Sequence, residues 1–152
     1  MTQEASGVHG AVWLAQSSRG DHAYAVWHEW NRHRYAVLPT GIGWDVVAVP
    51  RTWLRAAAQH RSEAWTDVPL LDDISVGYTY VWMPLGTHAD WAVPGTRALG
   101  SPWVIAVPQP SAPPAGVRKW AQPPGAYPRL MDPAALREAL DATQAAGGRT
   151  GP

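Results

Sequence analysis

The chain of 152 residues contains no cysteine. This absence excludes disulfide bonds, thiolate zinc sites, iron–sulfur clusters and cysteine nucleophiles, and it fits a reducing compartment. Long apolar runs are missing too: the longest, at residues 46–49 and 103–107, are far too short to cross a bilayer. The first six residues lack a basic start followed by an apolar stretch. We therefore expect a soluble, cytoplasmic protein with no targeting segment and no membrane contact.

Charge is also scarce. Charged residues make up 16% of the chain, and 12 Lys and Arg balance 12 Asp and Glu, so the net charge is zero. This balance argues against a strongly basic nucleic-acid protein, although it leaves room for a local basic patch. Phenylalanine is absent and Lys119 is the single lysine, whereas there are ten tryptophans. With 46% hydrophobic residues the chain can build a core, and we expect most tryptophans to fill it.

Helical and strand patterns alternate along the chain. Asp21 is placed to cap a first helix, and Pro50 and Pro133 each stand where a further helix begins. Apolar spacing of three and four predicts helices, and short β-branched or apolar runs predict strands. The predicted helices cover residues 22–33, 51–61 and 133–146, and the predicted strands 35–38, 44–49, 68–71, 76–83 and 103–107. We expect the strands at 44–49, 76–83 and 103–107 to share a central sheet, with Val47, Val49, Val81, Ile105 and Leu136 buried.

These elements predict one α/β (α+β) domain with a mixed central sheet flanked by helices. We place the domain at residues 21–146, after a partly flexible N-terminal segment at residues 1–20. Seven prolines in residues 108–128 predict an irregular surface arm. The pair Gly147-Gly148 should end the last helix and leave residues 147–152 as a flexible tail.

Common catalytic motifs are missing from the sequence. No HExxH zinc motif, no GxSxG elbow and no phosphate loop occurs. His88 and Asp90 are the one His/Asp pair close enough to share an ion, and Asp72-Asp73 is the one adjacent carboxylate pair. We interpret both pairs as solvated turn or cap residues, and we predict no metal site.

Three segments of the chain resemble, in the same order, three segments of a known protein family. They are VLPTGIGWDVVAVP at residues 37–50, VGYTYVWMPLGTHADW at residues 76–91 and GTRALGSPWVIAVPQPSAPPAGVRKWAQPP at residues 95–124. Together they resemble the bifunctional DNA primase/polymerase (prim-pol) domain, and more closely its short stand-alone actinobacterial type. With the DPAALREAL helix at residues 132–140, the likeness covers most of residues 24–141 and implies a prim-pol-like fold.

The resemblance implies a site at which carboxylates hold two divalent ions, and here those carboxylates are missing. Ala48 and Pro50 stand where the family has two Asp separated by one residue. The family's histidine falls on Thr79 and its third acid near Thr96. No Asp-x-Asp or Asp-x-Glu string exists in the chain. Because two-metal nucleotidyl transfer depends on such ligands, we expect no catalysis and no cofactor.

Three hypotheses follow. The first is a degenerate prim-pol-like module that binds single-stranded nucleic acid or a nucleotide through Arg97, Arg118, Lys119 and Trp120. Against it stands the plainer interpretation that Trp120 packs under the proline-rich arm while Arg118 and Lys119 face water. The second hypothesis is a protein-interaction module with a Trp- and Pro-rich surface. The third is an active primase/polymerase with a rearranged site for Mg²⁺ or Mn²⁺ that uses Asp45, Asp72, Asp73, His88 or Asp90.

Overall fold

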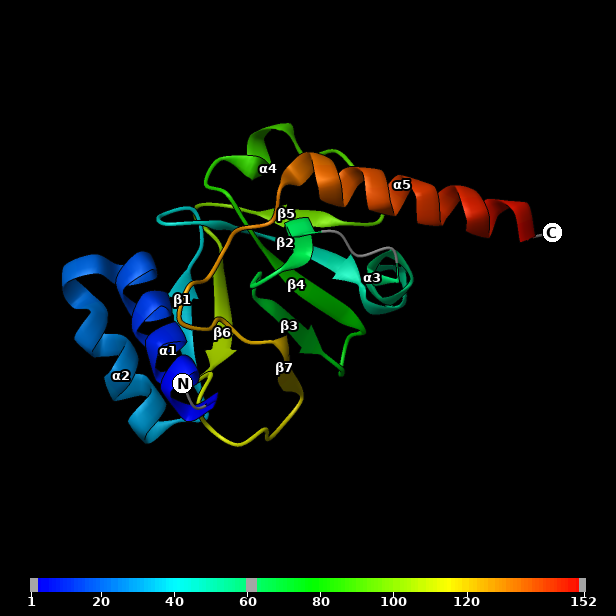
Figure 1. Ribbon diagram of the computed structural model, residues 1–152. Coiled ribbons are helices and arrows are strands. Elements are labelled where there is room, and N and C mark those ends of the chain that lie inside the picture. Colours follow the sequence, from blue (N-terminus) through cyan, green and yellow to red (C-terminus); the bar gives the residue numbers. More distant parts are fainter. Residues whose placement is uncertain (1–2, 60–62, 151–152) are drawn as a thin grey trace.

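The computed structural model describes residues 3–59 and 63–150 (Figure 1). Five strands form an antiparallel sheet in the order β5-β2-β4-β3-β7, and β1 pairs with β6 in a separate two-stranded antiparallel sheet. The strands are β1 (Tyr35–Pro39), β2 (Asp45–Pro50), β3 (Leu70–Asp73), β4 (Tyr78–Met83), β5 (Arg97–Leu99), β6 (Val104–Pro108) and β7 (Arg118–Gln122). The helices are α1 (Gln3–Arg19), α2 (Ala23–Arg32), α3 (Arg51–Ala58), α4 (Thr87–Asp90) and α5 (Pro133–Thr150), with 3-10 turns at Gly20–His22 and Glu63–Trp65.

The five-stranded sheet separates two hydrophobic cores. Side chains alternate between the faces of a strand, so Val47 and Val49 lie on one face and Val46 lies on the other. The first face packs against α3 and α5 through residues such as Leu54 and Leu136. The second face packs against the β1–β6 sheet, which α1 and α2 cover in turn (Figure 1). The chain is thus a single α+β domain whose central sheet is flanked by helices, as the sequence predicts.

The predicted core residues are confirmed: Val47, Val49, Val81, Ile105 and Leu136 are all buried. The tryptophans are mostly packed as well, and Trp103 is the one of the ten that is exposed. In the described part of the chain, no helix has the length and apolar character needed to cross a membrane.

Some predicted elements differ from the structure. The strand predicted at residues 103–107 is β6, but it pairs with β1 and not with the central sheet. The predicted arm at residues 108–128 is not irregular throughout, because β7 lies within it. Its prolines cluster at both ends, so the proline-free stretch between them keeps the backbone N–H groups that pair with β3.

Helix boundaries also differ. Residues 3–19 form α1, a helix that the sequence analysis did not predict. The helix after it has no side-chain cap from Asp21, because a 3-10 turn precedes it. Gly147-Gly148 does not end α5, which runs to Thr150. The helix predicted over residues 51–61 ends at Ala58. Its residues 60 and 61 lie outside the described residues, as do residues 1–2 and 151–152 of the expected flexible ends.

Candidate nucleic-acid interface

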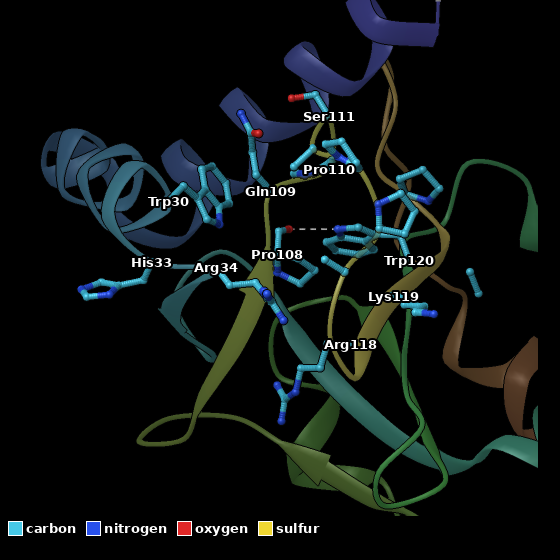
Figure 2. A pocket seen from close by; sticks show the side chains of 16 residues that line it. Trp30, His33, Arg34, Pro108, Gln109, Pro110, Ser111, Arg118, Lys119 and Trp120 are labelled. Atoms are coloured by element: carbon cyan, nitrogen blue, oxygen red, sulfur yellow. Dashed lines mark hydrogen bonds between the residues drawn. The ribbon is translucent and has the colours of Figure 1, made fainter.

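A pocket of about 820 Å³ opens between the end of α2, the proline-rich loop after β6, and β7 (Figure 2). The loop contains three prolines, Pro110, Pro113 and Pro114, which cannot donate to a neighbouring strand, so the chain bows outward between β6 and β7 instead of forming a tight hairpin. The lining residues are Trp30, His33, Arg34, Pro108, Gln109, Pro110, Ser111, Ala112, Pro113, Pro114, Ala115, Arg118, Lys119, Trp120, Ala121 and Pro123.

Two tryptophans hold the end of β6, where the loop begins. The Nε1–H of Trp120 donates to the carbonyl oxygen of Pro108 at 2.9 Å, which Figure 2 shows as a dashed line, and that of Trp30 donates to Val107 at 2.9 Å. Both indoles are half-buried, and Trp120 also packs on Trp82 with ring centroids 5.3 Å apart. Their polar edges are therefore satisfied, and what they offer to the pocket is apolar ring surface.

Helix α1 packs against both proline-rich stretches that flank β7. A Cβ added at Gly10 would lie 1.8 Å from the carbonyl oxygen of Pro124, and one added at Gly7 would lie 3.0 Å from the Cα of Ser111. The close approach at Gly10 leaves no room for a side chain, and the one at Gly7 would make a methyl group a tight contact. The unpredicted helix α1 thus positions both ends of the proline-rich segment around the pocket.

The lining of the pocket is basic. Arg34, Arg118 and Lys119 carry positive charge, and His33 lies beside them, whereas none of the acidic side chains that the structure describes contributes to the lining. Arg34 and Lys119 are exposed, and neither makes an ion pair within the described residues. Arg34 and Lys119 thus line the pocket without an ion pair among the described residues, Lys119 from the face of β7 opposite Arg118 and Trp120, where its cross-strand partner is Asp72. The pocket therefore gathers positive charge although the whole chain is neutral.

Arg118 has a different environment. Its Nε lies 3.2 Å from Oδ2 of Asp73, its Nη1 donates to the carbonyl oxygen of Ala106 at 2.6 Å, and its guanidinium lies 5.2 Å from the ring centre of Tyr80. Burial acts to raise the pKa of Asp73, but hydrogen bonds from Ser75 and the charge of Arg118 outweigh it, so the pKa of this carboxyl is lowered. Burial raises the pKa of the Tyr80 phenol, against the charge of Arg118. Arg118 is thus held in place at the edge of the pocket, and the carboxylate of Asp73 partly compensates its charge.

The structure brings together three of the four predicted binding residues. Arg118, Lys119 and Trp120 all line the pocket. Arg97 lies on β5, at the opposite edge of the five-stranded sheet, where its guanidinium lies 4.0 Å from the ring centre of Trp103. The expected alternative for Trp120 holds in part, since the indole does pack under the proline-rich loop. Arg118, however, faces Asp73 and not water.

Sequence reasoning missed Arg34 and Trp30 as lining residues. Trp30 is one of the tryptophans that the composition predicts as core residues, and only the hydrogen bond that its indole makes across 77 positions places it beside the pocket. Arg34 stands outside every predicted element, and no local signal marks it.

The four positions that the resemblance assigns to metal and nucleotide ligands do not share one face of the sheet: Ala48 and Pro50 lie on one face and Thr79 on the other. Ala48 shares the second sheet face with Tyr80, its direct partner on β4. Thr79, the neighbour of Tyr80, points to the opposite face, where its hydroxyl donates to Asp72 at 2.5 Å. Thr96 accepts from the indole of Trp91, which packs in the first core.

Of the remaining acidic candidates, Asp45 and Asp72 have partners of their own. Asp45 is fully buried, and its Oδ2 accepts from Nδ1 of His88 at 2.8 Å, from the backbone N–H of His88 at 2.9 Å and from that of Gly86 at 3.1 Å. Asp72 lies 3.4 Å from Nε of Arg51. Asp90 is exposed at the end of α4. In the described ranges, no three His, Asp or Glu side chains gather as a potential metal site.

Comparisons with known protein families, with characterised proteins and with solved structures found no match to this chain.

Proposed function

We propose that the chain is a non-catalytic module that binds single-stranded nucleic acid or a nucleotide in the pocket between α2, the proline-rich loop and β7. The observation that carries this proposal is the grouping of Arg34 and Lys119, which make no ion pair among the described residues, with the indoles of Trp30 and Trp120 around one pocket. Cations neutralise phosphates and tryptophan faces stack on bases, so this combination suits a nucleotide chemically. The volume of about 820 Å³ lies in the range of small-molecule sites.

The absence of catalysis is part of the proposal. Ala48 and Pro50 supply no carboxylate to the sheet face, and Asp45, Asp72 and Asp73 are engaged in contacts on different sides of the sheet. Mg²⁺ or Mn²⁺ would matter only if these groups rearranged into a two-metal site.

The alternative of a Trp-rich protein-interaction surface has less support, because nine of the ten tryptophans are buried or half-buried. An interface core of exposed aromatic residues would need more than Trp103.

The test is the affinity of the purified chain for a fluorescein-labelled oligothymidylate, measured by anisotropy at low salt. Arg34→Ala and Lys119→Ala should each weaken binding about tenfold, the value of one charge-assisted phosphate contact. Arg55→Ala is the matched control, because Arg55 is an exposed arginine on α3, which covers the other sheet face. Absence of binding, or equal losses in all three variants, would contradict the proposal.

A further inference from the structure

The side chain of Arg34 is packed in place, although its donors are unused. Within the described residues, its guanidinium makes no hydrogen bond and no ion pair. Its length nevertheless lies against the proline-rich loop at Gly116. A Cβ added at Gly116 would lie 3.1 Å from Cδ of Arg34 and 2.9 Å from its Nη1. The loop therefore restrains a long side chain that is otherwise free to sample many rotamers, and it leaves every N–H donor open.

This packing depends on glycine at position 116 for two reasons. The φ of Gly116 is +77°, in the left-handed region that favours glycine. An added Cβ would also collide with the hydroxyl of Tyr35, so the loop backbone lies close to Tyr35 and Arg34 at once. A methyl group at this position would displace the guanidinium, because the end of an arginine side chain moves more easily than a ring or a backbone.

The contact is built on the same end of the β1–β6 sheet as the apolar wall of the pocket. Tyr35 is the cross-strand partner of Pro108. The carbonyl oxygen of Pro108 accepts the hydrogen bond from the indole of Trp120. The pairing of β1 with β6 thus fixes the support of Arg34 relative to the indole on which a base would stack.

Arg34 is also the lining cation whose donors are most available to a phosphate. Arg118 is already paired with Asp73. Lys119 leaves β7 on the other face, opposite Asp72. A guanidinium with free donors can hold a phosphate through two parallel hydrogen bonds. Figure 2 shows the Arg34 side chain extending from the residue after His33 along the pocket.

Resting on the proposed function, we propose that the phosphate group of the ligand binds at Arg34, and that Gly116 is a positioning residue that holds Arg34 for it. Because the side chain is already restrained, binding a phosphate loses less conformational entropy than it would with a free arginine. Gly116 does not line the pocket itself, so it acts through Arg34.

The experiment measures binding of fluorescein-labelled dT12, an oligothymidylate, by anisotropy at increasing salt. Gly116→Ala should weaken binding about five- to tenfold, as Arg34→Ala does. Both variants should make the slope of log K against log salt concentration shallower by about 0.7, the value of one phosphate contact on a single strand. Adding Gly116→Ala to Arg34→Ala should cause no further loss. Tyr35→Phe removes the hydroxyl that crowds the new methyl group, so it should recover part of the Gly116→Ala loss.

Gly77→Ala is the matched control. Gly77 has a φ of +74°, but a Cβ added there would meet nothing within 4 Å. The substitution introduces the same backbone strain and should leave dT12 binding unchanged. Gly116→Asn is a second variant, because asparagine adopts the left-handed conformation more readily and still carries the Cβ that displaces Arg34. It should weaken binding as Gly116→Ala does, and thermal melting should show that the variants remain folded.

The outcomes separate the two proposals. If folded Gly116→Ala and Gly116→Asn bind dT12 like the wild type while Arg34→Ala weakens binding, Gly116 does not position Arg34 and the pocket function stands. If Gly116→Ala causes the same loss with and without Arg34, the glycine acts independently of Arg34, which overturns the positioning role. If Arg34→Ala leaves binding unchanged, or if the wild type does not bind, both proposals are wrong.

Discussion

At the scale of single residues, buried carboxylates place the short segments around the sheet. Asp45 is fully buried on β2, and its Oδ2 accepts three hydrogen bonds from Gly86 and His88 at the start of α4. The imidazole of His88 packs so closely on Gly100 that an added Cβ there would lie 2.3 Å from its Nδ1. A single acidic side chain thus ties α4 to the start of β2.

Asp45→Ala should therefore lower the free energy of unfolding by about 2 kcal/mol, because three donors lose a charged acceptor. Denaturant unfolding followed by circular dichroism measures the change. Asp90→Ala, an exposed substitution in the same helix, is the control and should stay within about 0.5 kcal/mol. Equal small losses in both variants would show that Asp45 does not hold α4.

The pH dependence of stability should reflect Asp73. Because its pKa is lowered in the folded state, the carboxylate contributes stability above its unfolded pKa, and this contribution is lost as the pH falls through the folded pKa. Below about pH 4 the wild type should lose stability more steeply than Asp73→Asn, which has no charge to lose. Thermal melts from pH 7 to pH 2 measure the difference. Parallel curves would contradict the assigned ion pair with Arg118.

At the scale of elements, local pattern predicts which residues are buried, whereas long-range contacts decide where an element lies. The alternation and β-branching of β2 predict both its conformation and its burial, which the structure confirms. The apolar run of β6 fits either sheet equally well, and its pairing with β1 depends on residues 65 or more positions away. Helix α1 escaped prediction because glycines and small residues interrupt its apolar spacing, and its close packing on the proline-rich loop explains them.

The variant Gly10→Ala tests that packing, because packing and helix propensity predict changes of opposite sign in the free energy of unfolding. In an exposed helix this change stabilises by about 1 kcal/mol, because alanine is the better helix former. Here the new methyl group would meet the carbonyl oxygen of Pro124 at 1.8 Å, so we expect a loss of at least about 1 kcal/mol in denaturant unfolding. Gln16→Ala, at an exposed position of the same helix, should be neutral or slightly stabilising. A stabilised Gly10→Ala variant would show that α1 does not pack on this loop.

The candidate site shows the same contrast between what local sequence predicts and what long-range packing decides. Arg118, Lys119 and Trp120 are consecutive, so the sequence could predict that they lie together. Arg97 was grouped with them on composition alone, and the strand order separates it by three strands. Trp30 and Arg34 reach the pocket only because α2 and β1 pack beside β6.

At the scale of the whole molecule, the neutral chain gives no long-range attraction to nucleic acid, so binding depends on a few local cations. We therefore expect modest affinity with a salt dependence set by Arg34 and Lys119, and no contribution from metal chemistry.

Strand synthesis should be absent. With a primed template, all nucleotides and either Mg²⁺ or Mn²⁺, the wild type should give no extension, because positioning alone does not replace metal-held charge neutralisation. A primer-extension gel checks this, with Asp72→Asn/Asp73→Asn and Asp90→Asn as companion variants. Incorporation by the wild type that either variant abolishes would contradict the non-catalytic account.

The most direct test of the account is the salt dependence of dT12 binding by the wild type and by the double variant Arg34→Ala/Lys119→Ala. Each phosphate neutralised on a single strand contributes about −0.7 to the slope of log K against log salt concentration. Fluorescence anisotropy at increasing salt should show binding by the wild type, and a slope that becomes shallower by about 1.4 in the double variant. Identical slopes, or no binding by the wild type at the lowest salt concentration, would contradict a phosphate-binding pocket at Arg34 and Lys119.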